Sequence, residues 1–194
     1  MPRSDDLHRL PSDLPVPVDD GACAHLVGRT LPRLALGSTE GGTVRIDRLG
    51  PGAAIIYCYP RTGLPDQDPP GGLAVWDAIP GARGCTPQSC GYRDLHADII
   101  AAGALVFGLS TQTTEYQAEA ASRLQLPFAL LSDSETRFAR ALRLPTFRVA
   151  GMELIRRLTL LTRGGRIEAV HYPVFPPDAD AARALAWVRA GEGG

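Results

Sequence analysis

Three short, unbroken apolar runs lie in the middle of the chain, at residues 53–59, 104–109 and 128–131. Runs of this length without polar interruptions are typical of strands that are buried on both faces of a sheet. A stretch with apolar residues at helical spacing follows each run. This alternation of strand and helix predicts an α/β fold with a mostly parallel sheet that carries helices on both faces.

The helix expected after the first run opens near Cys85 and fades near Gly103. Thr86 is the expected cap, and Pro87 suits the first helical position, because the first turn has no partner for the N–H that proline lacks. Apolar residues then follow at helical spacing, namely Tyr92, Leu95 and Ile99. A cysteine therefore stands at the carboxyl edge of the sheet, where α/β folds place their sites.

The remaining helices carry start signals of the same kind. Thr114 and Gln117 form a capping box for the second helix. Each of the next two helices has two candidate caps: Asp133 or Ser134 for one, and Asp178 or Asp180 for the last. Three residues of the last helix are expected to face inward: Ala182, Leu185 and Val188.

Two hairpins are predicted from turn signals. Short apolar stretches within residues 31–49 are broken by glycines, as in a hairpin. Near the end of the chain, residues 157–162 and 166–172 flank Gly164 and Gly165, a two-residue turn that favours antiparallel pairing. This hairpin closes the sheet, and the stretch at 145–151 before it is interpreted as irregular.

These elements fit one domain at residues 31–190, preceded by an N-terminal arm. Residues 1–30 are rich in proline and aspartate and have no period, so they are interpreted as a loosely packed lead-in. Residues 61–83 form a long connection rich in proline and glycine, and such loops in compact domains are usually functional or disordered. Trp76 and Ile79 within it favour a packed loop.

Charge and composition exclude several classes of partner. The 194 residues include 20 basic and 21 acidic side chains, a net charge of −1, which favours neither nucleic acid nor an anionic membrane as a partner. No apolar segment follows the first basic residue, and no run approaches the roughly 20 apolar residues of a membrane span. We therefore expect a cytoplasmic protein that needs no membrane.

The candidate chemistry lies in a close pair of cysteines, Cys85 and Cys90. In a reducing compartment such a pair is typical of a catalytic or metal-binding site. Because His96 and His171 show no ligand spacing, we expect neither a metal nor a cofactor. His96 is assigned to a helix surface and His171 to a strand with its ring satisfied. The other cysteines, at positions 23 and 58, are interpreted as packing residues.

The segment from Gly84 to Asp94 resembles the peroxiredoxin Q (bacterioferritin comigratory protein) branch of the peroxiredoxins. Residues 106–111 and 126–133 are similar to the next two landmarks of that family. The resemblance implies a thioredoxin-like fold with a central mixed sheet, helices on both faces and an N-terminal extension. It also implies that Cys85 is the peroxidatic cysteine and Cys90 the resolving one. The family arginine corresponds best to Arg157, with Arg156 as the neighbouring alternative.

The approach to Cys85 departs from the family pattern, which places a threonine or serine three residues before the peroxidatic cysteine and a proline seven before it. Those positions hold Ala82 and Ala78 here. The proline that ends the first strand is Pro60, with Thr62 close behind, so we infer an insertion of about eighteen residues, from the observed spacing of twenty-five. Three alternatives stay open: Thr62 supplies the hydroxyl, Thr86 replaces it, or the hydroxyl is missing.

Peroxide chemistry needs a thiolate, and both a helix start and a nearby guanidinium stabilise one. Residues i and i+5 of an intact helix have Cα atoms about 8 to 9 Å apart, whereas a disulfide tolerates at most about 7 Å. Cys85 and Cys90 can therefore join only if the first turn unwinds. Gly84 and Gly91 beside the pair lower the cost of that change.

The function expected from this sequence is reduction of hydrogen peroxide or alkyl hydroperoxides through a Cys85 sulfenic acid, resolved by Cys90. The expected partners are the peroxide and a thioredoxin-like dithiol donor, and the chain is expected to act as a monomer or homodimer. The alternative is a thiol–disulfide oxidoreductase or redox sensor on the same fold, which the alanine at position 82 favours. A third alternative is a non-catalytic protein whose inserted loop binds a partner.

Overall fold

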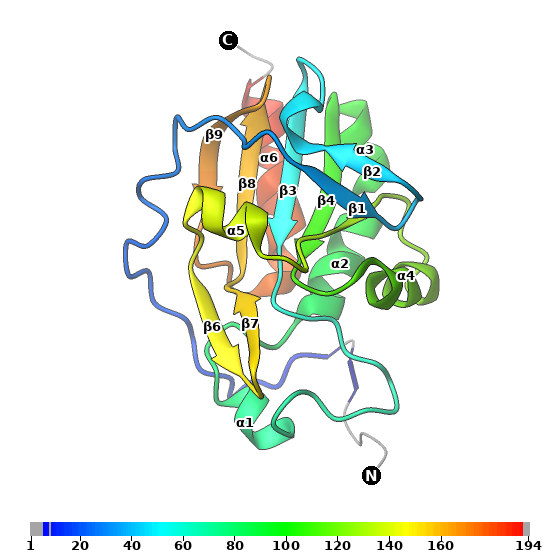
Figure 1. Ribbon diagram of the computed structural model, residues 1–194, viewed down its shortest axis with the longest axis vertical. Coiled ribbons are helices and arrows are strands. Elements are labelled where there is room, and N and C mark those ends of the chain that lie inside the picture. The colour runs from blue at the N-terminus through cyan, green and yellow to red at the C-terminus, as the bar shows by residue number, and fades with distance from the viewer. Residues whose placement is uncertain (1–5, 8, 192–194) are drawn as a thin grey trace.

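The computed structural model describes residues 6–7 and 9–191 and contains a twisted seven-stranded sheet with helices around it (Figure 1). The strand order is β2-β1-β5-β4-β3-β8-β9. The strands are β1 (Ala35–Ser38), β2 (Thr43–Arg45), β3 (Ala53–Cys58), β4 (Ala104–Ser110), β5 (Leu130–Ser132), β8 (Leu158–Arg163) and β9 (Arg166–His171). A separate two-stranded sheet pairs β6 (Thr146–Val149) with β7 (Met152–Ile155).

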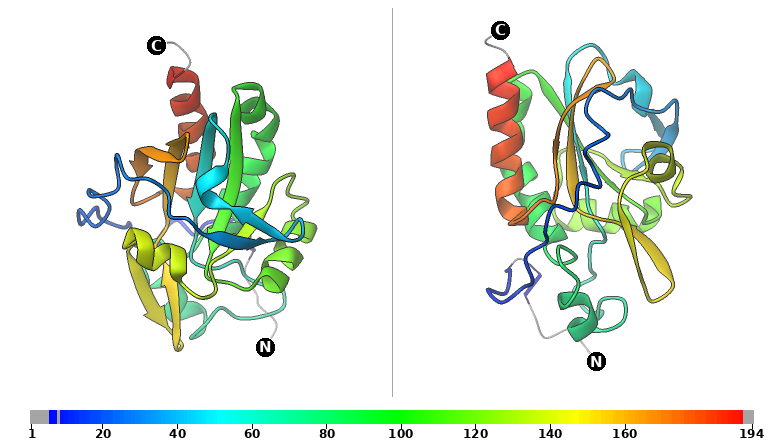
Figure 2. Two further views of the ribbon diagram at one scale, coloured as in Figure 1. Left: turned by 45° about the horizontal axis from the view of Figure 1, so that its top comes forward. Right: turned by 90° about the vertical axis from the view of Figure 1, so that its left-hand side faces the viewer.

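The helices are mostly short. They are α1 (Leu73–Asp77), α2 (Cys85–Asp94), α3 (His96–Ala101), α4 (Thr114–Arg123), α5 (Arg137–Leu142) and α6 (Asp180–Gly191), with 3-10 turns η1 (Ile46–Arg48) and η2 (Pro177–Ala179). In the right-hand view of Figure 2, α6 lies along one face of the sheet, and the β6–β7 hairpin projects on the other side.

The mixed sheet that the family resemblance implies is confirmed, whereas the mostly parallel sheet expected from the alternation of strand and helix is wrong. Only the β3–β4 and β4–β5 pairings are parallel. The predicted hairpins at both ends of the domain are confirmed, as β1–β2 and β8–β9, but each joins the central strands in the antiparallel sense: β1 pairs with β5, and β8 with β3. Four of the six strand pairings in this sheet are therefore antiparallel, and two are parallel.

β3 lies inside the sheet, between β4 and β8, as its unbroken apolar run predicts, and all of its residues are buried. Successive side chains of a strand point to opposite faces. Ile55 and Tyr57 therefore pack on one face, with α2, α3 and α6, whereas Ile56 and Cys58 pack on the other, with α5. We call these the α6-side core and the α5-side core. Cys85 belongs to the α6-side core.

The segment before the domain is not loosely packed throughout. Cys23 and Leu26 are buried in the α5-side core. The amide of Gly28 donates to the carbonyl of Ile167 in β9, and Thr30 forms an isolated bridge with Arg166. Residues 23–30 therefore pack against β9 and the α5-side core, although the sequence pattern assigned them to a loosely packed arm.

The predicted helix from Cys85 to near Gly103 is confirmed in extent but differs at its start and middle. Its cap position is Gly84, so Thr86 is not the cap, and the helix is interrupted at Leu95 between α2 and α3. Gly84 has a φ of +104°, which an L side chain rarely adopts. A backbone turn, and not a side-chain cap, therefore starts the helix.

Other end signals are shifted by small steps. The cap of α4 is Thr113, whose side chain accepts from the amide of Tyr116, in place of Thr114. The carboxylate of Asp133 accepts the amides of Phe138 and Ala139 at the start of α5, although the cap position is Thr136. In α6 the inward residues include Leu185 and Val188 as expected, but Ala182 is exposed and Ala181 and Ala184 take its place.

The stretch at 145–151, interpreted as irregular, belongs to the β6–β7 hairpin, and this hairpin packs against the long connection at 61–83. Trp76 of α1 is buried together with Ala82, Val149 and Leu154. The Trp76 ring lies 6.3 Å from that of Phe147 in β6. The packed loop expected from Trp76 is thus confirmed, and it and the hairpin share a small third core.

None of the helices in the part of the chain that the structure describes is long and apolar enough to cross a membrane.

We predict that Trp76→Ala loosens the 61–83 segment without unfolding the sheet, because Trp76 belongs to the small third core and to neither of the two main cores. Truncation of a buried tryptophan costs about 3–5 kcal/mol. Hydrogen exchange should therefore quicken by tenfold or more, as an order of magnitude, in residues 61–83, while β3 and β4 stay protected. Val75→Ala, on the exposed side of α1, is the control. Equal loss of protection in β3 would contradict the prediction.

Candidate active site

Cys85 is the first residue of α2, and its side chain is only 4% exposed. The turn before it is tightly enclosed: a Cβ added at Gly84 would lie 2.4 Å from Cγ of Pro177 and 2.9 Å from Cδ2 of Leu10. Glycine is therefore required there by space as well as by φ. The sulfur sits at the start of the helix, where unpaired amides favour an anion.

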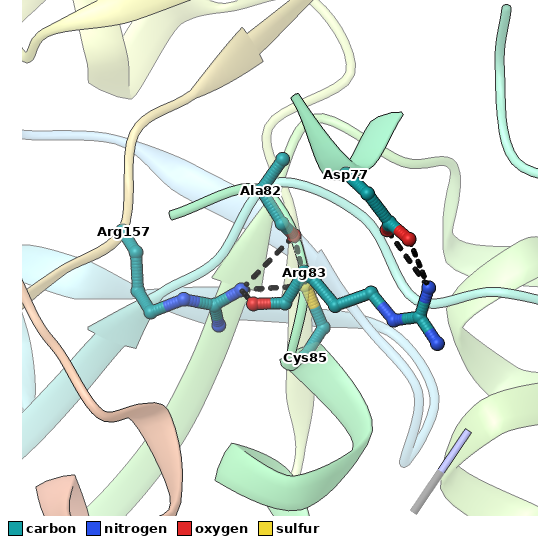
Figure 3. A network of polar contacts seen from close by, with 5 residues as sticks. All are labelled: Asp77, Ala82, Arg83, Cys85 and Arg157. Carbon is teal, nitrogen blue, oxygen red and sulfur yellow. Dashed lines mark hydrogen bonds and ion pairs between the residues drawn. The ribbon is translucent and has the colours of Figure 1, made fainter. Parts of the chain in front are cut away.

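Arg157 lies beside Cys85, with its Nη2 3.2 Å from the sulfur (Figure 3). It is the residue directly before β8 and is 2% exposed. The same Nη2 donates to the carbonyls of Ala82 (3.2 Å) and Arg83 (3.1 Å), and Nε donates to that of Gly81 (3.2 Å). These carbonyls fix the guanidinium against the sulfur, a position in which its positive charge stabilises a thiolate.

Gln88 links the Arg157 guanidinium to the buried carboxylate of Asp180. It lies one turn after Cys85 in α2, and its side-chain oxygen accepts from Nη1 of Arg157. Its Nε2 donates to Oδ2 of Asp180, at 2.9 Å. Gln88 is fully buried, so both ends of its amide are used within the protein.

Asp180 collects further hydrogen bonds at the start of α6. Oδ2 accepts from Tyr92 (2.8 Å) and Thr159 (2.6 Å), and Oδ1 lies 2.8 Å from Nδ1 of His171. Burial opposes ionisation, but the hydrogen bonds from His171, Thr159 and the other donors outweigh it and lower the pKa of Asp180. A buried carboxylate therefore lies behind the Arg157 guanidinium. His171 is a satisfied strand residue, as expected.

Arg83, on the opposite side of Cys85, is held by the inserted segment. Its Nη1 lies 2.8 Å from Oδ1 and 2.9 Å from Oδ2 of Asp77, at the end of α1, as Figure 3 shows. Arg83 is 7% exposed. The ion pair ties α1 to the residues directly before Cys85.

Cys85 lines a cavity of about 180 Å³. Thr62 and Thr86, the two hydroxyl candidates, line the same cavity. Thr62 is fully buried, and its Oγ1 donates to Oε1 of Gln112 at 3.1 Å. Pro60 is buried at the end of the strand but does not line the cavity.

The walls of the cavity come from several parts of the chain. The inserted segment contributes Trp76, the N-terminal part contributes Leu7, and the β6–β7 hairpin contributes Met152. Arg61 lies over the ring of Tyr116, 4.2 Å from its centroid. The inserted segment thus builds most of the approach to Cys85.

Cys90 lies on α2, one turn and a half beyond Cys85, and is half-buried. Burial raises the pKa of the Cys90 thiol, against the lowering effect of Arg93. The helix is continuous from Cys85 to Asp94, and all four cysteines are present as thiols. In this state both cysteines lie in an intact helix.

The remaining sequence candidates lie elsewhere. Cys23 and Cys58 are in the α5-side core, and burial raises the pKa of the Cys23 thiol to about 12. His96 is partly buried beside the ring of Phe128, at 5.6 Å. The guanidinium of Arg156 lies 5.9 Å from the ring of Phe147. Within residues 6–7 and 9–191, no group of three or more His, Cys, Asp or Glu side chains could hold a metal.

Sequence reasoning missed Gln88, Asp180 and the Arg83–Asp77 pair. Gln88 had a usable signal, because residues three apart share a helix face and Gln88 is three after Cys85. Asp180 was considered only as a helix opener. The Arg83–Asp77 ion pair had no signal, because the sequence pattern did not predict α1, the helix that carries Asp77.

Comparisons with known proteins identify the family and the fold of the chain. The AhpC/TSA family matches residues 70–170, just over half of the chain. The putative peroxiredoxin bcp of Coxiella burnetii is 29% identical over 109 residues, which cover 56% of this chain and 60% of that protein. The chloroplastic peroxiredoxin Q of Sedum lineare is 28% identical over 151 residues, or 78% and 71% of the two chains. The alignment thus spans less than two thirds of the Coxiella protein.

Solved structures show the same fold. Peroxidoxin BcpB from Mycobacterium tuberculosis superposes with a TM-score of 0.69 at 25% identity, over 86% of this chain and 98% of that one. Peroxiredoxin Q from Xanthomonas campestris gives a TM-score of 0.63 at 19% identity, over 92% and 98%. The thioredoxin-like fold implied by the resemblance is confirmed. The chain belongs to the AhpC/TSA family of peroxiredoxins, with relatives on the peroxiredoxin Q and Bcp branch.

Proposed function

We propose that this protein is a thiol peroxidase that reduces hydrogen peroxide or alkyl hydroperoxides with Cys85 as the peroxidatic cysteine. The observation that carries the proposal is the position of the Cys85 sulfur at the start of α2, 3.2 Å from Nη2 of Arg157. A helix start and a buried guanidinium together stabilise the thiolate that peroxide chemistry needs.

In the first step the Cys85 thiolate attacks one oxygen of the peroxide, and the O–O bond breaks. The sulfur gains an oxygen as sulfenic acid, and the other oxygen leaves, with a proton, as water or an alcohol. Arg157 neutralises charge that develops on the leaving oxygen, which is electrostatic stabilisation of the transition state.

Thr62 is the proposed source of the hydroxyl that the family pattern places near the peroxidatic cysteine. It lines the cavity at Cys85, and its proton is committed to Oε1 of Gln112. A hydroxyl whose proton is engaged in this way keeps its lone pairs free to accept from the incoming peroxide. The Gln112 contact supports Thr62 over Thr86, because it fixes the direction in which the lone pairs point.

In the second step Cys90 resolves the sulfenic acid. Its thiol condenses with Cys85–SOH, a disulfide forms, and water leaves. Because the Cα atoms of residues i and i+5 in a helix are about 8 to 9 Å apart, α2 must unwind between the cysteines. The half-buried position of Cys90 also requires its exposure before it reacts as a thiolate.

A dithiol donor of the thioredoxin type then reduces the Cys85–Cys90 disulfide and is itself oxidised to a disulfide. Such a cycle requires a reducing compartment, which favours the cytoplasm. A thiol–disulfide oxidoreductase without peroxidase activity would use the same two cysteines, and the measurements below separate the two activities.

We predict that reduced wild-type protein loses the Cys85 thiol rapidly and stoichiometrically on mixing with hydrogen peroxide, and that Cys85→Ser abolishes this loss. Cys90→Ser should still react once but accumulate sulfenic and then sulfinic acid, because no disulfide protects the sulfur. Mass spectrometry after timed quenching measures both products. Slow loss at the rate of free cysteine would instead favour the oxidoreductase, and normal turnover in Cys90→Ser would assign resolution to another thiol.

We predict that Arg157→Met lowers the second-order rate constant for sulfenic acid formation by roughly 10²–10³, the usual effect of removing a donor from a developing oxyanion. Stopped-flow measurement of Trp76 fluorescence is suitable, since Trp76 lines the Cys85 cavity. Arg156→Met is the matched control, because that guanidinium lies beside Phe147. Equal losses in the two variants would contradict the role of Arg157.

We predict that Thr62→Val slows reaction with peroxide by about tenfold or more, whereas Thr62→Ser restores most of it, because only the hydroxyl is required. Thr86→Val, at the second hydroxyl candidate, should react at nearly the wild-type rate. The second-order rate constants with hydrogen peroxide decide between the positions. A large loss in Thr86→Val with none in Thr62→Val would reverse the assignment.

A further inference from the structure

The Asp180 carboxylate is buried behind the site and touches neither Cys85 nor the cavity. It is 1% exposed and accepts hydrogen bonds from side chains on three other elements, α2, β8 and β9. Such a cluster is costly to assemble unless every polar group in it is satisfied. The donors around Asp180 connect it, through Gln88 and Arg157, to the Cys85 sulfur.

Arg157 is linked to Asp180 through Gln88, and the two hydrogen bonds of this link can run in only one direction. An ionised carboxylate only accepts and a guanidinium only donates. Gln88 lies between them, so its NH₂ group must face Asp180 and its oxygen must face Arg157. Without the carboxylate the Gln88 NH₂ group would lose its acceptor, and the side chain would be held only through its oxygen, by Arg157. Asp180 thus anchors the far end of the amide that supports Arg157 beside the Cys85 sulfur.

Asp180 also holds α2 in place. Gln88 lies between Cys85 and Cys90, in the segment that must unwind before the two sulfurs can join, and Tyr92 follows two residues after Cys90. Both side chains donate to the same oxygen of Asp180, Gln88 at 2.9 Å and Tyr92 at 2.8 Å. The Tyr92 ring also stacks on Tyr57 of β3, with centroids 4.4 Å apart. Unwinding therefore has to break at least the Gln88 bond.

We propose that Asp180 is a positioning residue that acts on the two steps in opposite directions. It speeds peroxide attack, because it orients Gln88 and so Arg157 against Cys85. It slows disulfide formation, because it holds α2 in the helical state. The inference rests on the proposed function, in which Cys85 attacks the peroxide and Cys90 resolves the product.

Opposite effects on the two steps distinguish this role from general support of the fold. Loss of a residue that supports only parts of the fold away from α2 and Arg157 would not move the two steps in opposite directions. Loss of Asp180 should lower the rate constant for sulfenic acid formation and raise that for disulfide formation in the same variant.

The experiment is a stopped-flow single turnover of reduced protein with hydrogen peroxide, which gives both rate constants from Trp fluorescence. We expect Asp180→Ala to slow sulfenic acid formation by about tenfold, as for loss of a partner that orients a site residue. Disulfide formation should become about three- to tenfold faster, as expected when hydrogen bonds that hold the helix are lost. Asp180→Asn, which can keep one acceptor oxygen, should restore both constants to within about threefold of wild type.

Asp178→Ala is the matched control, since Asp178 is an exposed carboxylate two residues earlier and should leave both constants unchanged. A slowing of both steps in Asp180→Ala, or no change in disulfide formation, would overturn the proposal.

If Asp180→Ala does not fold, Tyr92→Phe and Tyr59→Phe decide the question. Each removes one buried hydroxyl and keeps its ring, but the Tyr92 hydroxyl binds Asp180, whereas that of Tyr59 donates to Gln117 of α4. Tyr92→Phe alone should speed disulfide formation, by about threefold. Equal rates in the two variants would reject the proposal.

Failure of the proposed function is separable from failure of this inference. If wild-type Cys85 does not react with peroxide, the peroxidase proposal fails. Disulfide formation between Cys85 and Cys90 can then be driven with diamide, and the helix-holding role of Asp180 still predicts faster closure in Asp180→Ala. Unchanged closure would reject that role as well.

Discussion

The site depends on a buried positive charge that the backbone satisfies. Arg157 is almost fully enclosed, and its guanidinium donates to the carbonyls of three consecutive residues, Gly81 to Arg83, which Gly84 separates from Cys85. A charge in this position is tolerated only when its donors are engaged. The same bonds join the end of the inserted segment to the start of β8. The position of Cys85 is therefore set by strand pairing, because β8 is fixed in register against the central strand β3.

The strands that could be predicted are those whose signal is local. An unbroken apolar run is enough to identify β3 and β4 as strands, although only β3 is buried throughout and Leu105 of β4 is exposed. The sense of pairing is different: nothing within β1 says that it lies antiparallel to β5, a choice made by contacts far apart in sequence. The β6–β7 hairpin was missed for a related reason. Its apolar side chains face Trp76 of the inserted segment, and Arg148 and Glu153 interrupt its pattern.

The candidate site was predictable only where the family pattern holds. Cys85 and Arg157 became candidates because their surroundings resemble known peroxiredoxins, whereas Thr62, where the family pattern fails, stayed one of three alternatives, and both it and Thr86 line the cavity at Cys85. The sequence pattern indicates that Asp180 is a candidate helix cap. The neighbouring residues do not show whether the side chain of such a cap faces water or the interior. Its inward orientation depends on donors from α2 and β8, which only the folded chain brings together.

The alternation of β3 has a consequence for the two cysteines outside the site. Cys58 points to the α5 side of the sheet, where Cys23 is also buried, and Cys85 lies on the α6 side. A hydrogen-bonded sheet with closely packed side chains on both faces separates these two groups of thiols. In the folded chain the sheet therefore keeps Cys23 and Cys58 apart from Cys85, so that topology limits the disulfide partners of Cys85 before any difference in thiol reactivity matters.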